Sequence, residues 1–189
     1  SYNNVSNTLV SASGQKGVMI ASATGQNANY NTISNVTSTA NTGTGSNGDG
    51  IAIGGGSAGG TYRGNKIVGC TTHANQRYGI LIDPTGATIF AETIVADNMV
   101  LSNSGTGILT VTGSTGLRVT NNHSAGNTVA QYSISVTSDG YFDGAGLGTP
   151  EGVIIAPIGS RWARTNGGAG TSLYIKESGN NVNTGWIAK

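Results

Sequence analysis

Short apolar segments recur along the first two thirds of the chain, and each follows a glycine. They are Val18–Ile20, Ile51–Ile53, Ile80–Ile82 and Ile108–Val111. The preceding glycines, Gly17, Gly50, Gly79 and Gly107, are nearly evenly spaced along the chain. Such segments are too short for helices and suit strands, and their near-constant spacing indicates an internal repeat.

A second series of strand-like segments lies between the first and tends to end in Asn or a small polar residue. It covers residues 31–35, 65–70, 98–103 and 117–122, and a last segment at 132–136 alternates strictly between apolar and polar. Two short strands per ~30 residues, joined by Gly, Asn and Ser turns, predict a solenoid in which successive coils stack at strand spacing. The irregular stretch 39–48 is expected to be an excursion between strands.

Alternation along these strands divides the side chains between the interior and the surface. We expect Ile51, Ile53, Ile80, Ile82, Ile108, Ile134 and Val136 inside, and Met19, Leu81 and Leu109 outside. Asn35, Asn103 and Asn122 directly follow strands, where stacked amides could bridge consecutive corners. A β-sandwich of short strands is the alternative fold. The solenoid is favoured because coil, not hairpin, separates the repeats.

Composition narrows the class of protein. Gly, Thr, Asn and Ser make up half of the 189 residues, only 9% are charged, and the net charge is +1. The scarcity of Glu, Lys and Gln excludes helix bundles, and the weak charge argues against nucleic-acid binding. No apolar run is long enough for a membrane span, so no membrane insertion is expected. The chain opens at Ser1 without Met, which we interpret as a piece of a longer protein or a processed N-terminus.

The pattern changes after Asp139. We expect a shaft over residues 1–138, a turn-rich link over 139–148 and a small β module over 149–189. The module is predicted to contain strands at 153–156, 160–164 and 172–177, with a Gly-rich loop at 166–170 between the last two. Its ~40 residues are near the lower limit for independent folding. Trp162, Tyr174 and Trp186 are therefore predicted to lie in a trimer interface, or else to pack on the last coil.

The C-terminal motifs resemble the module that closes many bacteriophage tail spikes and tail fibres. The matching elements are Pro150-Glu151-Gly152, Ala156-Pro157-Ile158-Gly159-Ser160, Trp162, Gly167-Gly168-Ala169-Gly170, Leu173-Tyr174-Ile175-Lys176-Glu177-Ser178-Gly179 and Gly185-Trp186. The resemblance covers only the end of the chain, roughly from Gly148 to Lys189. It implies an all-β homotrimer with a right-handed parallel β-helix shaft, located on a virion tail and binding a bacterial surface polysaccharide.

The resemblance leaves the chemistry open. A polysaccharide depolymerase and a purely structural trimeric shaft are the alternatives to adhesion. Hydrolysis of a glycan needs two carboxylates about 5 to 9.5 Å apart. The weak catalytic candidates are Asp49, Asp83, Glu92 and Asp97, although Asp49 before Gly and Asp83 before Pro also suit ordinary turns.

For glycan contact without cleavage, aromatic and Arg residues cluster in one region of the sequence. The candidates are Tyr62, Arg63, Arg77 and Tyr78. Solvated loops, with the tyrosines packed on a neighbouring coil, are the alternative. Gly54 to Gly59 fits a nucleotide-loop pattern but leads into a strand instead of a helix, so a solenoid loop is expected. Cys70 and His73 offer too few ligands for zinc, and neither metal nor cofactor is predicted.

Overall fold

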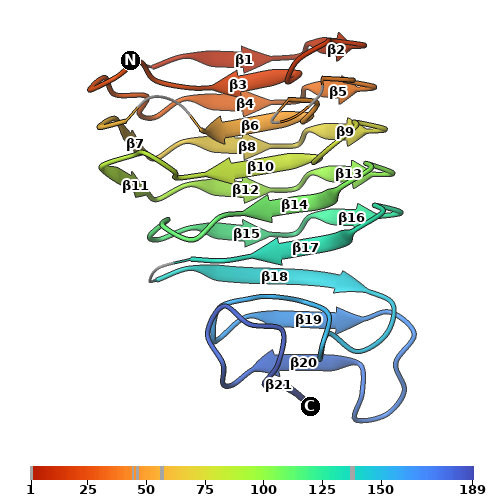
Figure 1. Ribbon diagram of the computed structural model, residues 1–189. Helices are drawn as coiled ribbons and strands as arrows, with labels where there is room; N and C mark the ends of the chain where they lie inside the picture. Colours follow the sequence, from red (N-terminus) through yellow and green to blue (C-terminus); the bar gives the residue numbers. More distant parts are fainter. Residues whose placement is uncertain (1, 44, 46, 56–57, 137–138) are drawn as a thin grey trace.

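The computed structural model describes residues 2–43, 45, 47–55, 58–136 and 139–189. Every regular element in these residues is a β-strand, and they contain no helix of the length and apolarity needed to cross a membrane. The strands stack in coils from the N-terminus at the top of Figure 1 to the C-terminus at the bottom. The observed fold is therefore all-β, as predicted.

The described residues form four sheets, which we name A to D. Sheet A contains β1 (Asn4–Ser6), β4 (Thr32–Ser34), β8 (Lys66–Val68), β12 (Ile94–Ala96), β15 (Arg118–Thr120), β18 (Tyr141–Gly146), β19 (Arg161–Arg164), β20 (Leu173–Lys176) and β21 (Trp186–Ala188). Sheet B contains β2 (Leu9–Ser11), β5 (Thr37–Thr39), β9 (Thr71–His73), β13 (Met99–Leu101) and β16 (His123–Ala125). Sheet C contains β3 (Val18–Ile20), β6 (Ile51–Gly54), β10 (Ile80–Asp83), β14 (Thr106–Thr110) and β17 (Ala130–Ile134), and sheet D contains β7 (Thr61–Arg63) and β11 (Ile89–Ala91).

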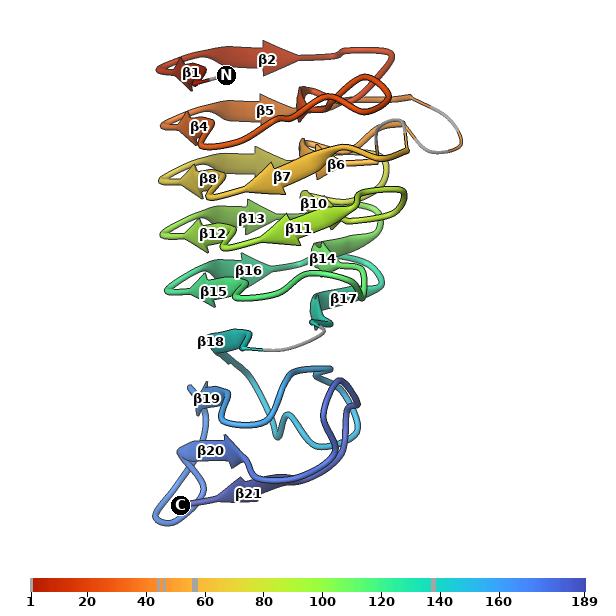
Figure 2. The same cartoon turned by 90° about the vertical axis from the view of Figure 1, so that its left-hand side faces the viewer.

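Parallel pairing of successive coils confirms the solenoid and excludes the sandwich for the shaft. In sheet A the residues in register are Asn4, Thr32, Lys66, Ile94, Arg118 and Tyr141. The coils between them are unequal, the longest running from Thr32 to Lys66 and the shortest from Arg118 to Tyr141. Figure 2 shows β4, β8, β12 and β15 one above the other. Strand register therefore holds although coil length varies.

The interior is a narrow aliphatic column. The side chains predicted to point inward are all buried: Ile51, Ile53, Ile80, Ile82, Ile108, Ile134 and Val136. Of the three expected outside, Met19 is exposed and Leu109 half-buried. The prediction for Leu81 is wrong, because its side chain is buried where it lies between Ala52 and Leu109 in register.

A coil holds more strands than the two that the sequence suggests. The second series mixes two sheets, because residues 31–35, 65–70 and 117–122 include strands of sheet A whereas 98–103 includes β13 of sheet B. A sharp corner separates the two sheets. Asn7, Asn35, Asp97 and Asn121 occupy this corner with φ between 51° and 57°, and Gly69 has φ 64°. Asn and Asp tolerate this left-handed conformation, which explains their place there.

After Asn35, Gly69, Asp97 and Asn121 the next residue is buried, and two of these four residues are Asn. Side-chain amides form ladders, Asn3–Asn31–Asn65, Asn41–Asn75–Asn103–Asn127 and Asn98–Asn122, and all of these residues except Asn3 are buried. The stacked-amide prediction is thus confirmed for Asn103 and Asn122. It is wrong for Asn35, which forms the exposed corner, while the buried position after it is Val36.

The glycines before the sheet C strands pack directly against one amide ladder. A Cβ on Gly79 would lie 2.7 Å from Asn103 Nδ2, and one on Gly50 would lie 2.7 Å from Asn75 Nδ2. Gly17 and Gly107 are similarly close to Asn41 and Asn127. The repeated glycine is therefore needed for space, because an amide fills the volume of the missing methyl group.

The C-terminal region is joined to the shaft by strand pairing. Residues 139–148 were expected as a link, but β18 lies there, pairs with β15 and pairs in parallel with β19. Strands β19, β20 and β21 then form an antiparallel meander. Residues 153–156 make only isolated bridges and not the predicted strand. The predicted strands at 160–164 and 172–177 correspond to β19 and β20.

The predicted interface role of Trp162, Tyr174 and Trp186 is not supported, because their own chain buries all three. Trp162 is 2% exposed and Trp186 is 4% exposed. Trp162 packs against Phe142 and Tyr132 of the last coil, with ring centroids 6.4 and 6.0 Å apart. The indole of Trp186 donates to the carbonyl of Ile154 at 2.9 Å. Trp162 thus packs on the last coil, which is the alternative, whereas Trp186 contacts Ile154 within the C-terminal region.

Two of the predicted segments include positions that the structure does not describe. The excursion at 39–48 includes positions 44 and 46, and the glycine loop at 54–59 includes positions 56 and 57. Within the described part, Thr39 belongs to β5 and Gly54 ends β6. The next described element after the glycine loop is strand β7. No described helix begins there, as a nucleotide-binding loop would require.

Candidate functional site

The outer surface of sheet A is the candidate site. Its central column is formed by the outward residues in register, Thr32, Lys66, Ile94, Arg118 and Tyr141. The residue that follows each of these in its strand is buried, for example Ile67, Val95 and Val119. We call this column the sheet A face, together with the left-handed corners on its two sides, Tyr30, Gly64 and Glu92 before the strands and Asn35, Asp97 and Asn121 after them. A rigid strand holds each of its side chains, so their spacing follows the strand spacing.

Lys66 and Arg118 give the face its charge. Both side chains are exposed, and neither makes an ion pair or side-chain hydrogen bond in the part of the chain that the structure describes. The half-buried Ile94 lies between them. Two strand steps separate the cations, a distance of about 9.6 Å at the usual spacing. The sequence analysis did not identify either residue.

An aromatic pair borders the face near the N-terminus. The rings of Tyr2 and Tyr30 stack with centroids 5.5 Å apart and an angle of 18° between their planes. Tyr2 is 81% exposed and Tyr30 is 46% exposed. Tyr30 has φ 57°, and its ring occupies the space where a side chain on Gly64 would begin, 2.5 Å from the ideal Cβ. Gly64 thus leaves room for the Tyr30 ring on the next coil.

Two predicted residues lie at the same corner. The Nε of Arg63 is 3.9 Å from a carboxylate oxygen of Glu92, and both side chains are about half exposed. Glu92 occupies a left-handed position with φ 57°, in line with Tyr30 and Gly64 on neighbouring coils. Arg63, a glycan-contact candidate, and Glu92, a catalytic candidate, are therefore neighbours at the border of the sheet A face.

The opposite border carries Asp97, another catalytic candidate. Its carboxylate accepts a hydrogen bond from the side-chain amide of Asn121 on the next coil. Glu92 and Asp97 flank β12 and its preceding residue, so strand geometry puts their Cα atoms roughly 13 to 16 Å apart. The two carboxylates also have separate partners, Arg63 for Glu92 and Asn121 for Asp97. The arrangement does not favour a catalytic pair here.

The C-terminal end of the face contains a polar cluster. Arg161 Nη2 donates to Asp143 Oδ2 at 2.6 Å, and its guanidinium lies 5.9 Å from the centre of the Tyr141 ring. The hydrogen bond and the negative charge of Asp143 raise the pKa of Arg161. Within this cluster the charge of Arg161 is paired with that of Asp143, whereas Lys66 and Arg118 have no such partner among the described residues.

Asp49, Arg77 and Tyr78 form a separate cluster in which Asp49 is buried and the other two are half-buried. Arg77 donates to both carboxylate oxygens of the fully buried Asp49, and Lys16 Nζ lies 3.2 Å from Oδ2. The Arg77 guanidinium lies over the Tyr78 ring at 4.5 Å. A carboxylate neutralised by two cations and shielded from solvent is a structural bridge between coils. These interactions contradict catalysis by Asp49 and leave Arg77 unsuited to bind a glycan.

The remaining candidates lie elsewhere. Tyr62 is 1% exposed, stacks on Phe90 and accepts hydrogen bonds from Ser22, so its predicted glycan contact is wrong. Alternation along β7 turns it inward while Arg63 turns outward. Asp83 accepts from the backbone N–H of Thr85 at 3.0 Å, which is turn chemistry.

Cys70 and the acidic residues do not form a metal cluster. No group of three or more His, Cys, Asp or Glu side chains able to hold a metal occurs among residues 2–43, 45, 47–55, 58–136 and 139–189. Cys70 is buried, and burial raises the pKa of its thiol. The thiol lies near backbone carbonyls, where a neutral S–H is favoured.

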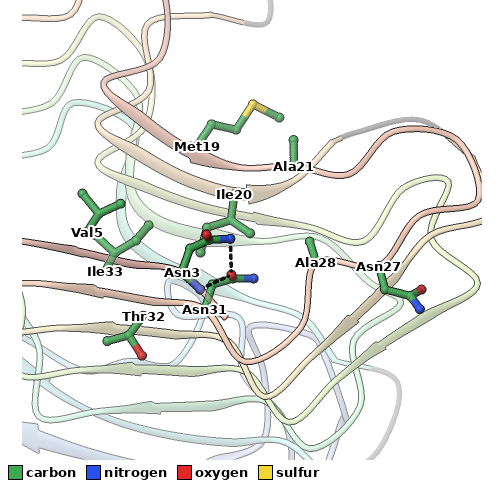
Figure 3. A pocket seen from close by; sticks show the side chains of 10 residues that line it. All are labelled: Asn3, Val5, Met19, Ile20, Ala21, Asn27, Ala28, Asn31, Thr32 and Ile33. Carbon is green, nitrogen blue, oxygen red and sulfur yellow. Dashed lines mark hydrogen bonds between the residues drawn. The ribbon is translucent and has the colours of Figure 1, made fainter. Parts of the chain in front are cut away.

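The described residues also line two cavities, the first of which reaches Thr32 of the sheet A face. The first, about 250 Å³, is at the N-terminal end of the coil interior, where Val5, Ile20 and Ile33 lie beside the Asn3–Asn31 ladder (Figure 3). The second, about 880 Å³, is a groove between β16 and the C-terminal region. Val129, Leu147 and Val153 line it and are well exposed, so its walls are largely apolar.

Comparison with known proteins supports the fold assignment. The family model described as right-handed beta helix region matches residues 1–128. No curated protein matches the chain, and no solved structure does. The match covers more than half of the chain and coincides with the parallel coils of sheets A, B and C. The chain therefore belongs to the right-handed β-helix family.

Proposed function

We propose that this chain is the distal part of a phage-type tail spike or tail fibre and that its sheet A face binds a bacterial surface polysaccharide. Two facts support the proposal. Right-handed β-helix domains are common in proteins that bind or degrade polysaccharides. The ordered motifs from Pro150 to Trp186 resemble the closing module of tail spikes.

The exposed Tyr2–Tyr30 stack is the observation that carries the binding proposal. An aromatic ring exposes an apolar face that packs against the C–H groups of a sugar ring. Tyr30 keeps its orientation because its backbone is fixed in a left-handed corner and its ring lies on Gly64. The ring is therefore preorganised, which lowers the entropic cost of binding.

We also propose that the chain assembles as a homotrimer through the groove beside β16. Val129, Leu147 and Val153 expose apolar surface there, and β16 is the last strand of sheet B. A second copy of the chain could cover both the apolar side chains and the strand edge. Light scattering should give a trimer for the native chain and smaller species for Leu147→Asp with Val153→Asp. A native monomer would contradict the assembly.

The binding proposal is tested with a bacterial glycan array and a Tyr30→Ala variant. Ala is compatible with the corner, because Ala12, Ala40 and Ala74 adopt φ of 51° to 54° elsewhere in this fold. We expect about tenfold weaker binding to any glycan that the native chain retains. Met99→Ala, which removes an exposed apolar side chain from sheet B, is the matched control and should bind normally.

Other results of the same experiment would favour the alternatives. Release of oligosaccharides from the bound polysaccharide would indicate a depolymerase. An array without any signal, together with intact trimers, would indicate a structural shaft.

A further inference from the structure

We propose that the bound polysaccharide is acidic, and that it lies along the stacking direction with one anionic group at Lys66 and another at Arg118. This inference rests on the proposed function, since it names the class of glycan that the sheet A face would take. The anionic groups could be carboxylates, sulfates or phosphates, because a cation recognises the charge that they share.

The pairing of all nine Lys and Arg side chains singles out these two. Lys16 and Arg77 contact Asp49, Arg63 contacts Glu92, Arg161 contacts Asp143 and Lys189 contacts Glu177. Lys176 donates to the carbonyl of Thr184, and Arg164 donates to Asn166. Within the described residues, Lys66 and Arg118 are the cations left without such a partner.

The fold brings these two cations into one column. They are far apart in the sequence, yet both are in register with Ile94, on either side of it. Both point out of the same face at about 9.6 Å from each other, two strand steps apart. That distance is comparable to the length of a disaccharide. A polymer with one acidic sugar in each disaccharide would therefore meet both cations when it runs along the stack.

The surroundings favour a sugar polymer. Ile94 gives an apolar contact between the cations, and aromatic rings border the column at both ends, Tyr30 near β4 and Tyr141 on β18. The nearby acids have partners: Glu92 contacts Arg63, Asp97 accepts from Asn121 and Asp143 contacts Arg161. With so few free cations among the described residues and a net charge of +1, the face lacks the cluster of positive charge that nucleic acids require.

The test is isothermal titration of the native chain with oligogalacturonate as the acidic probe and with neutral dextran oligosaccharides. The variants are Lys66→Gln, Arg118→Gln and their combination. Lys189→Gln removes the same charge from the C-terminal region and is the matched control. Raising salt from about 0.05 M to about 0.5 M screens exposed charges and should weaken the acidic complex.

We expect oligogalacturonate to bind more tightly than dextran, and each Gln variant to lose about threefold to fivefold in affinity. Lys189→Gln should bind like the native chain. Equal binding of both probes, or no effect of the Gln variants, would overturn the inference. If Tyr30→Ala still weakened dextran binding in that case, the proposed function would stand. Failure of both probes and of the bacterial glycan array would overturn both. Tighter binding of duplex DNA than of oligogalacturonate would also overturn the inference.

Discussion

Arg77 holds the carboxylate of Asp49 with two hydrogen bonds, from Nε to Oδ1 at 2.6 Å and from Nη2 to Oδ2 at 2.9 Å. The two residues are on successive coils, and the carboxylate is completely buried. Bidentate pairing of this kind fixes both distance and orientation. The pair therefore connects neighbouring coils by charge, where the Asn ladders connect them by amide hydrogen bonds.

Loss of the Asp49 charge should destabilise the shaft strongly. Asp49→Asn leaves Arg77 and Lys16 without their buried counter-charge, and we expect a loss of about 3 kcal/mol or more in the free energy of unfolding. Urea denaturation followed by circular dichroism measures it. Asp83→Asn, at a partly exposed turn, is the control and should cost less than about 1 kcal/mol. Similar losses for the two variants would contradict the structural role.

The interior amide ladder predicts a clear difference between two asparagines. Asn103 accepts two hydrogen bonds from Asn75 and donates two to Asn127. Asn103→Ala leaves buried donors unpaired and should cost about 3 kcal/mol. Asn35→Gly keeps the left-handed corner and should change stability by no more than about 0.5 kcal/mol. Thermal melts of the two variants compare these effects directly, and equal melting temperatures would refute the ladder's contribution.

Glycine is needed before β10 for reasons of space. A methyl group at position 79 would lie 2.4 Å from Val100 Cγ1, so Gly79→Ala should lose about 1 to 3 kcal/mol. The control is Gly14→Ala, since no atom lies within 4 Å of its ideal Cβ and its φ is not in the left-handed region. That variant should be neutral or slightly more stable. A destabilised control, or a neutral Gly79→Ala, would show that packing is not the reason.

Alkaline pH should weaken the fold through Cys70 and Tyr132. Burial raises the pKa of both groups, so the fold favours their neutral forms. That stability is fully present below the ordinary pKa of each group, 9.0 for Cys and 10.0 for Tyr, and is lost as the pH rises above it. Lys176 acts in the opposite direction because burial lowers its pKa.

Unfolding midpoints measured between about pH 8 and pH 11 should therefore fall, and fall less steeply for Cys70→Ala. The native thiol should also resist alkylation until the chain unfolds. Rapid labelling of Cys70 in the folded chain at about pH 8 would be inconsistent with its burial.

The sequence predicts the sheets whose inward residues are apolar and misses those whose inward residues are polar. Ile51, Ile80 and Ile108 mark sheet C because aliphatic residues alternate with others there. In sheet B the inward residues include Ser38, Thr72 and Ser124, which have no apolar signal. Strand β18 was missed for a similar reason, since glycine dilutes its pattern.

The candidate site depends on register, which local patterns do not determine. Lys66 and Arg118 share a column because the coil from Lys66 to Ile94 and the shorter coil from Ile94 to Arg118 both close in register, and nothing in the sequence near either cation specifies this. Arg63 could be placed on the surface from alternation along β7, and Tyr62 in the interior by the same rule. The Tyr2–Tyr30 stack had one available signal, a Tyr directly before an Asn in each case.

The amide ladders also have a direction. Each Nδ2 of Asn41, Asn75 and Asn103 donates toward the C-terminal coil, and Gln131 accepts from Asn127 at the last step. The amide dipoles consequently add head to tail, and hydrogen bonds aligned in this way polarise and strengthen one another. If one coil were inverted, its amide N–H group would face another N–H group, or its amide oxygen another oxygen, and the hydrogen bond would be lost. The ladder therefore imposes a one-way polarity on the growing stack, and it ends where Gln131 supplies the final acceptor.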